Sequence, residues 1–350
     1  MDSAIHPSLR TVEWKDNSVI MIDQTKLPNE LVYVKYTDFK DVAEAIRNLI
    51  VRGAPAIGVS GAFGLALAAL RSKATDRDSL IHDMEEAKKI LFETRPTAIN
   101  LAWGLERIMN VARTAKTVSE IRDAVVKEAK ITAEEDIQIN MRMGKNGSTL
   151  FDNNDTIMTH CNAGALATVA YGTALGVIRA TRDSGKNIKV IATETRPVMQ
   201  GSRLTAFELK HDGIDVSLIP DTAVGYSMAN GLVSKVIVGA DRVLATGHVY
   251  NKIGTYQVAL MAKQHGIPFY VAAPLSTFDM KSTPKDVVIE QRKATEVTGV
   301  AGKKTAPDDI KVINPAFDMT PPELISGIIT EAGVAKPPFE ESIKKLFAKL

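Results

Sequence analysis

The chain contains a single cysteine, Cys161, in a stretch whose composition suits chemistry at the end of a strand. The apolar run at residues 155–159 predicts a strand, and residues 160–167 (HCNAGALA) predict a Gly-containing turn and the start of a helix. Open α/β sheets place their chemistry where strands end and helices begin. A thiol near a helix start also ionises more easily, because that end of a helix favours negative charge. Cys161 is therefore a candidate catalytic residue; the alternative is a small buried hydrophobic residue.

A carboxylate also follows a predicted strand. Asp241 comes shortly after the apolar residues 236–238, so the end of that strand would carry its carboxyl group out of the sheet. Partial burial there would raise the pKa of Asp241 and let it exchange protons near neutral pH. The alternative is that Asp241 caps a turn or forms an ion pair with Arg242.

Several basic and polar residues suit a phosphate-bearing substrate. Asn251 and Lys252 precede Gly254 and Thr255, a pattern in which backbone N–H groups, a hydroxyl and an ammonium would converge on an anion at a helix start. Alone, Lys252 would more often face solvent.

Two turns in the first part of the chain carry arginines. Arg52 precedes Gly53 and Ala54 between two predicted helices, and Arg95 precedes a proline in a second such turn. A guanidinium group binds phosphate in a bidentate manner, and Gly53 permits close approach of the backbone. Each turn alone is a weak pattern, but together with Lys252 they favour a phosphate-bearing substrate.

Other chemistries lack the residues that they need. His160 is adjacent to Cys161, and in an extended strand their side chains would point to opposite faces, so adjacency does not indicate a Cys–His pair. No spacing of Cys, His and carboxylates resembles a metal site. Neither a GxGxxG nor a Walker A sequence occurs. We therefore expect no metal and no cofactor.

The elements that must position these residues fall into two parts. Residues 9–36 predict short strands, and residues 38 to about 145 predict helices that end with a long amphipathic stretch. After residue 152, apolar runs alternate with helical stretches, which predicts a parallel sheet covered on both faces. We expect an α/β protein: a smaller N-terminal α+β domain of short strands and helices at residues 1–120, and a Rossmann-like domain at 121–350 that begins with the long linking helix.

Three apolar stretches are assigned to helices. Residues 54–70 contain several glycines and are short for a membrane span, so they predict a buried helix pair or one core helix. Residues 165–182 and 321–331 are predicted as helices of the second domain.

Composition restricts the compartment and the partners. Among 350 residues, 43 Lys and Arg nearly balance 41 Asp and Glu, and the basic residues are not interleaved with aromatic ones, so a nucleic-acid surface is not indicated. A single cysteine excludes an intrachain disulfide and favours a reducing compartment. The first 14 residues lack the apolar segment of a signal peptide. We expect a cytoplasmic protein with a small-molecule substrate and neither a nucleic-acid nor a membrane partner.

Together, these stretches resemble the 5-methylthioribose-1-phosphate isomerase family of methionine salvage. That family shares its fold with ribose-1,5-bisphosphate isomerase and with the regulatory subunits of translation initiation factor 2B. The resemblance runs from residues 11–14 (TVEW) to 314–318 (NPAFD). It implies a homodimer with the active site between the two domains and a catalytic pair at Cys161 and Asp241. The substrate-binding positions that it implies are Arg52, Gly53, Ala54, Arg95, Gln200, Asn251 and Lys252.

The resemblance also implies a reaction: an aldose–ketose isomerase, an intramolecular oxidoreductase, would convert 5-methylthioribose 1-phosphate to 5-methylthioribulose 1-phosphate. Because phosphate occupies the anomeric oxygen, the ring opens only if an acid protonates the ring oxygen as its bond to C1 breaks. A hydrogen then moves from C2 to C1, either as a proton through a phosphoenolate or as a hydride. The division of these steps between Cys161 and Asp241 stays open.

Two alternatives to this function remain. Thr246, Gly247 and His248 stand where the family commonly has Asn-Gly-Asp, and Tyr250 replaces a small residue, so 5-deoxyribose 1-phosphate or ribose 1,5-bisphosphate is an alternative substrate. A regulatory subunit like those of initiation factor 2B is the other alternative, although such a subunit would not need the pair of Cys161 and Asp241.

Overall fold

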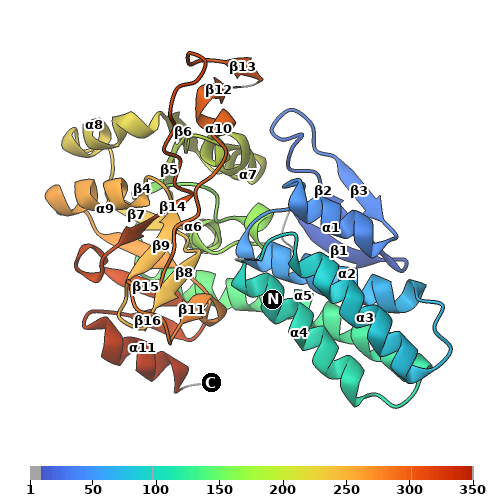
Figure 1. Ribbon diagram of the computed structural model, residues 1–350. Helices are drawn as coiled ribbons and strands as arrows, with labels where there is room; N and C mark the ends of the chain where they lie inside the picture. The colour runs from blue at the N-terminus through green and yellow to red at the C-terminus, as the bar shows by residue number, and fades with distance from the viewer. Residues whose placement is uncertain (1–8, 97, 301, 349–350) are drawn as a thin grey trace. The chain divides into compact units, whose positions relative to one another are not determined.

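The computed structural model describes residues 9–348 except 97 and 301 (Figure 1). The chain folds into two compact units: unit 1 comprises the residues up to Met141 and Gly164–Gly172, and unit 2 comprises Arg142–Ala163 and Thr173–Leu350. This division differs from the expected boundary at residue 120. The reason is helix α5 (Val118–Ser148), whose buried residues Ile121 and Val125 belong to the hydrophobic core of unit 1.

Unit 1 begins with the short strands that the sequence predicts. Strands β1 (Val12–Lys15), β2 (Ser18–Ile22) and β3 (Tyr33–Tyr36) form an antiparallel sheet in that order. Asp16 and Asn17 both have positive φ, 50° and 51°, in the two-residue turn between β1 and β2. Such a turn matches the natural twist of a hairpin.

Four helices precede α5 in the part of the chain that the structure describes. They are α1 (Phe39–Arg47), α2 (Ala54–Arg71), α3 (Arg77–Phe92) and α4 (Ile99–Thr114). Asp38 and Asp76 cap α1 and α3, since each carboxylate accepts a backbone N–H at 2.9 Å. Helix α2 is one helix rather than a pair. It is long and apolar enough to cross a membrane, but 78% of it is buried inside the structure, as is typical of a core helix.

The segment Gly164–Gly172 belongs to unit 1 although it follows a strand of unit 2 in the sequence. Thr11 and Gln24 each donate a side-chain hydrogen bond of 2.7 Å to its backbone carbonyls, and the Asp136 carboxylate of α5 accepts from Val169 N–H at 2.8 Å. The helix predicted at residues 165–182 is therefore wrong in its first half. Only a 3₁₀ turn (Ala165–Ala167) precedes helix α6 (Ala174–Asp183), because Val169 is buried in the core of unit 1.

Asp136 makes the stability of unit 1 depend on pH. Burial raises its pKa from 3.8 to about 7, although hydrogen bonds from Val169 and Asn140 oppose the rise. Because the folded pKa exceeds the unfolded one, this group's contribution to the free energy of unfolding falls as pH rises from about 4 to about 7, by up to about 4 kcal/mol at about 1.4 kcal/mol per pKa unit. We expect Asp136→Asn to remove that loss in urea denaturation curves compared at about pH 5 and pH 8.

The matched control is Asp123→Asn, at an exposed position of the same helix. It should leave the pH dependence of unfolding unchanged. An equal pH dependence in wild type and Asp136→Asn would contradict the prediction.

Unit 2 contains the Rossmann-like sheet that the sequence predicts (Figure 1). Its seven strands have the order β16-β15-β10-β7-β4-β5-β6, and all neighbours are parallel except β15 and β16. The strands are β4 (Thr156–Thr159), β5 (Lys189–Thr193), β6 (Val216–Ile219), β7 (Lys235–Val238), β10 (Phe269–Ala272), β15 (Gly327–Thr330) and β16 (Gly333–Ala335). The connecting helices include α6, α7 (Ala206–His211), α8 (Val224–Ala229) and α9 (Thr255–Gln264).

A second sheet of unit 2 carries two of the candidate binding residues. Its order is β11 (Phe278–Asp279), β8 (Arg242–Leu244), β9 (Val249–Lys252) and β14 (Phe317–Thr320). Further along the chain, α10 (Thr295–Thr298) leads into the hairpin of β12 (Gly299–Val300) and β13 (Lys303–Lys304).

The helix predicted at residues 321–331 is wrong. A 3₁₀ turn (Pro322–Leu324) is followed there by strand β15, and the last helix is α11 (Phe339–Phe347). Ile328 and Ile329 are fully buried because β15 pairs in parallel with β10 inside the sheet. A short apolar run of this kind does not distinguish a buried strand from a helix by its periodicity.

Candidate active site

The topology of the main sheet brings Cys161 and Asp241 to one edge. From β4 the chain continues through β5 to β6 on one side, and it then returns to build β7, β10 and β15 on the other. Strands β4 and β7 are parallel neighbours, with Met158 opposite Val236. Cys161 follows β4 by two residues and Asp241 follows β7 by three. The crevice outside the strand ends at such a switch of direction is where open α/β sheets bind ligands.

Gln200 belongs to the same edge, because it follows β5, the other neighbour of β4. Its side chain is 7% exposed, and its Oε1 atom is buried without a hydrogen-bond partner among the described residues. The next residue, Gly201, packs so tightly that a Cβ atom would lie 1.7 Å from the Thr193 carbonyl oxygen. A buried carbonyl oxygen of this kind suits a hydroxyl donor of a ligand.

Two threonines hold the peptide groups of Cys161. The residue has a positive φ of 63°. Its N–H donates to Thr195 Oγ1 at 2.9 Å, and its carbonyl accepts from Thr205 Oγ1 at 2.5 Å. Both threonines are fully buried. The half-buried thiol therefore stands on a backbone turn that is fixed from two sides.

No α-helix begins at Cys161, contrary to the prediction. The chain continues into the 3₁₀ turn Ala165–Ala167, and α6 begins only at Ala174. Ionisation of the thiol by a helix start immediately after β4 is thus not supported.

The stretch that holds Cys161 is itself fixed by Asp221. The backbone N–H groups of Thr195 and Arg196 donate to its two carboxylate oxygens at 2.8 and 2.7 Å. These supporting residues were missed from the sequence. The one available signal was the pair of threonines, Thr193 and Thr195, at a strand end that already looked functional.

Both ring nitrogens of His160 have partners. Nδ1 lies 2.6 Å from Thr193 Oγ1, and Nε2 lies 2.8 Å from the Ile253 carbonyl oxygen. Burial lowers the pKa of His160; the Ile253 hydrogen bond and the charge of Asp221 oppose this, and the charge of Lys252 adds to it. Both ring nitrogens of His160 are therefore engaged by the Thr193 side chain and the Ile253 backbone.

Asp241 is exposed, so the expected partial burial of its carboxyl group is wrong for this chain. Its backbone N–H donates to the Tyr250 carbonyl oxygen at 2.9 Å. The neighbouring Arg242 lies 3.5 Å from the carboxylate of Asp279. The strand end does carry the carboxyl group of Asp241 out of the sheet.

The start of α9 is not an open anion site. The N–H groups of Gly254 and Tyr256 donate to the carboxylate of Asp318 at 2.7 and 3.1 Å, and burial raises the pKa of Asp318 to about 6 against these hydrogen bonds. The Thr255 hydroxyl donates to the Lys252 carbonyl at 2.6 Å. The predicted cradle of backbone N–H groups is thus occupied by an internal carboxylate.

Asn251 and Lys252 lie next to each other in β9 and are 5% and 6% exposed. Asn251 Nδ2 donates to Thr255 Oγ1 at 3.0 Å. Lys252 is close enough for its charge to act on His160 and on Glu296. A buried ammonium beside the Cys161 turn suits a phosphate ligand.

The other candidate binding residues belong to unit 1. Gly53 precedes α2 with φ 93°, and a Cβ atom there would lie 2.3 Å from the Ala167 carbonyl oxygen. Only glycine therefore allows the turn of Arg52, Gly53 and Ala54 to pack on the segment that follows Cys161 in the sequence. Arg95 lies between α3 and α4 and is half-buried. The described residues contain no cluster of His, Cys, Asp or Glu that could hold a metal ion.

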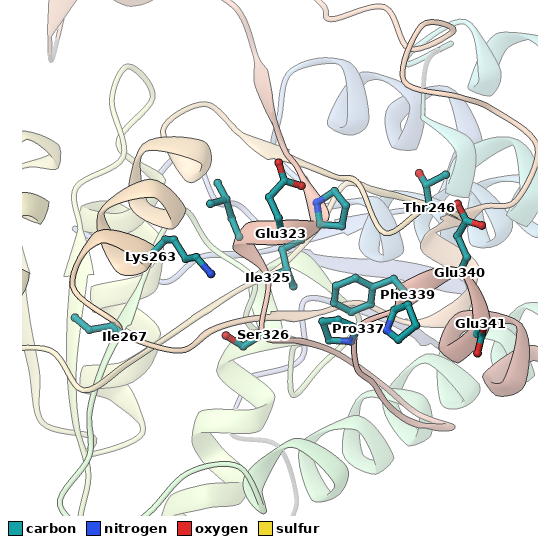
Figure 2. Close-up of a pocket in the computed structure, with 13 residues that line it drawn as sticks. Thr246, Lys263, Ile267, Glu323, Ile325, Ser326, Pro337, Phe339, Glu340 and Glu341 are labelled. Carbon is teal, nitrogen blue, oxygen red and sulfur yellow. The ribbon is translucent and has the colours of Figure 1, made fainter.

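The cavity in Figure 2 lies at the opposite edge of the main sheet. It has a volume of about 660 Å³ and is lined by Lys263, Ile267 and Phe339 among others. Ile267 precedes β10, and Ser326, also in the lining, precedes β15, so these residues mark the amino ends of the parallel strands. No predicted site residue lines this cavity.

The chain belongs to the initiation factor 2 subunit family, whose model matches residues 50–337. A relative from Thermosipho africanus, named methylthioribose-1-phosphate isomerase, is 54% identical over 96% of this chain and 98% of its own length. The crystal structure of 5-methylthioribose 1-phosphate isomerase from Pyrococcus horikoshii OT3 is similar with a TM-score of 0.94 and 46% identity over 100% of both chains. The crystal structure of translation initiation factor eIF-2B, subunit delta, from A. fulgidus is similar with a TM-score of 0.91 and 49% identity. The match covers 97% of this chain and 100% of that chain.

Proposed function

We propose that this chain is an aldose–ketose isomerase that converts 5-methylthioribose 1-phosphate to 5-methylthioribulose 1-phosphate. The observation that carries the proposal is the similarity, over nearly the full length, to relatives named for that activity. The position of Cys161 and Asp241 at the switch point of the sheet supports it, because two proton-exchanging groups follow adjacent strands there.

The reaction is redox-neutral within one molecule. The bond between C1 and the ring oxygen breaks and that oxygen gains a proton. The hydrogen on C2 moves to C1 as a hydride, or C2 loses a proton and C1 gains one. By either route the 2-hydroxyl also loses its proton, which balances the proton gained by the ring oxygen, and C2 becomes a carbonyl carbon. Each route needs one group that gives a proton and one that accepts it. We assign these roles to Cys161 and Asp241 as a pair.

Binding of the substrate is assigned to the remaining candidate residues. Arg52, Arg95 and Lys252 would hold the phosphate, and Gln200 and Asn251 would bind hydroxyl groups, with Gly53 and Ala54 approaching through their backbone. The buried Oε1 atom of Gln200 supports its part of this assignment. We further propose that the protein is cytoplasmic and works as a homodimer.

The proposal is tested with purified protein and no added cofactor. We expect the NMR spectrum of 5-methylthioribose 1-phosphate to be replaced by that of the ketose. Parallel reactions with 5-deoxyribose 1-phosphate and ribose 1,5-bisphosphate should show lower kcat/KM. Preference for either of these sugars would overturn the substrate assignment, and no turnover of any of the three would overturn the proposed class of reaction.

The second candidate is a regulatory subunit of a translation factor. The similarity to the A. fulgidus structure described as an eIF-2B subunit favours it. This function predicts co-purification with translation initiation factor 2 and no isomerase activity, so the same assay separates the two candidates.

A further inference from the structure

His160 connects the turn that carries Cys161 with residues 253–254, which directly follow Lys252 and are called here the Lys252 loop. On one side, its Nδ1 atom lies 2.6 Å from Thr193 Oγ1. Thr193 Oγ1 lies 3.3 Å from Thr195 Oγ1, and Thr195 Oγ1 accepts the hydrogen bond from Cys161 N–H. On the other side, its Nε2 atom lies 2.8 Å from the carbonyl oxygen of Ile253, the residue after Lys252. The whole connection lies within unit 2.

The chemistry of these groups fixes the direction of the hydrogen bonds. A carbonyl oxygen only accepts, so Nε2 of His160 donates to Ile253. A neutral imidazole then accepts at Nδ1, and the donor is the Thr193 hydroxyl. Thr195 Oγ1 accepts from Cys161 N–H, and the Thr195 hydroxyl has two acceptors at 3.3 Å, Thr193 Oγ1 and the Thr193 carbonyl oxygen. The hydrogen bonds from Thr193 to His160 and from His160 to Ile253 therefore both point away from the Cys161 turn.

The ring of His160 is also tightly packed. His160 is 2% exposed, and Thr193 and Thr195 are fully buried. Gly254 has a positive φ of 102°, and a Cβ atom there would lie 2.9 Å from Cε1 of the ring. The Lys252 loop is thus packed against the imidazole at Gly254.

We propose that His160 is a positioning residue that, as the neutral tautomer with its proton on Nε2, holds the Lys252 loop in register with the Cys161 turn. The inference rests on the proposed function for the roles of Cys161 and Lys252. It assigns His160 no proton transfer to the substrate. Protonation of Nδ1 would place a second donor against the Thr193 hydroxyl and reverse the hydrogen bond between them.

Two substitutions of His160 each remove one of its two hydrogen bonds and keep the other. His160→Gln retains a donor at the position of Nε2 and loses the acceptor for Thr193. We expect kcat to fall about tenfold with KM near that of wild type, since a hydrogen bond to the Cys161 side is lost. His160→Asn retains an acceptor near Thr193 and does not reach Ile253. We expect KM to rise about tenfold with kcat little changed.

Alkylation of Cys161 gives a readout that does not depend on the proposed substrate. Because Cys161 is the only thiol of the chain, its rate of reaction with iodoacetamide reports on this turn alone. We expect the rate in His160→Gln to differ several-fold from that of wild type and the rate in His160→Asn to match it. Thr193→Val should behave like His160→Gln, and Thr193→Ser, which keeps the hydroxyl, like wild type. These two variants test the connection even if the His160 variants fail to fold.

The outcomes distinguish failure of the proposed isomerase function from failure of the positioning role of His160. Wild type that turns over no pentose phosphate would overturn the proposed function, while the alkylation rates would still test the connection. Active wild type with variants in which kcat and KM change together, or with equal alkylation rates in all variants, would overturn the positioning role.

Discussion

Cys161→Ser is expected to reduce kcat for the isomerisation of 5-methylthioribose 1-phosphate by about 10² to 10⁴-fold, the usual contribution of a general acid–base group. Serine is close to cysteine in size, and the hydrogen bonds to Thr195 and Thr205 involve only the backbone of residue 161. The turn should therefore persist, while the hydroxyl does not ionise near neutral pH as a thiol does. The measurement is kcat and KM by NMR, with circular dichroism to verify the fold.

Asp241→Asn should cause a loss of the same order, because the amide keeps the shape of the carboxyl group and cannot exchange a proton. The matched control is Asp215→Asn. Asp215 is likewise exposed, but it precedes β6 and so lies at the amino end of a strand of the same sheet. It should retain wild-type activity. Wild-type rates in both Cys161→Ser and Asp241→Asn would contradict the assignment of the pair.

The sequence predicts those parts of the fold whose hydrophobic periodicity arises from burial in a single hydrophobic core. The amphipathic stretch that became α5 and the alternating runs that became β4, β5 and β7 are examples. Residues 165–173 show why other parts could not be predicted. Their apolar side chains are buried as the pattern indicates, but Val169 is buried in unit 1. Periodicity indicates that a residue is buried and does not say in which core.

The candidate site likewise has residues that the sequence predicts and residues that it does not. The residue types and their places after strands pointed to Cys161 and Asp241, because the ends of parallel strands share one edge of a sheet. Asp221 and Thr205 left no such signal, and they lie 60 and 44 residues from Cys161 in the sequence. Thr205 binds the carbonyl oxygen of Cys161, and Asp221 binds the backbone of the stretch that holds Cys161. The carboxylate of Asp318 that occupies the start of α9 is equally remote. Local motifs cannot show which distant residue fills a hydrogen-bonding site.

A buried ion cluster also supports the Cys161 turn and makes Arg179 a critical residue for stability. Its guanidinium lies 2.8 Å from a carboxylate oxygen of Glu208 and 2.6 Å from one of Asp212, and all three side chains are at most 7% exposed. The other oxygen of Glu208 accepts from Asn162 Nδ2 at 2.8 Å, next to Cys161. The cluster thus connects α6 and α7 to the residue that follows the thiol.

We expect Arg179→Met to lower the free energy of unfolding by about 3 to 5 kcal/mol, because it removes the guanidinium group that pairs with two buried carboxylates. Both tryptophans, Trp14 and Trp103, belong to unit 1, so their fluorescence would not report on this change. Unfolding in urea is better followed by far-UV circular dichroism and by the alkylation rate of Cys161.

Two further variants show whether charge is the cause of the lower stability of Arg179→Met. Arg47→Met removes an arginine from an exposed ion pair with Glu44 and should cost at most about 1 kcal/mol. Adding Glu208→Gln and Asp212→Asn to Arg179→Met neutralises both carboxylates and should restore most of the stability, while the new amide oxygen can still accept from Asn162. If Arg179→Met unfolds at the wild-type urea concentration, the cluster does not stabilise unit 2. If the triple variant is no more stable than Arg179→Met, lost packing rather than unpaired charge accounts for the effect.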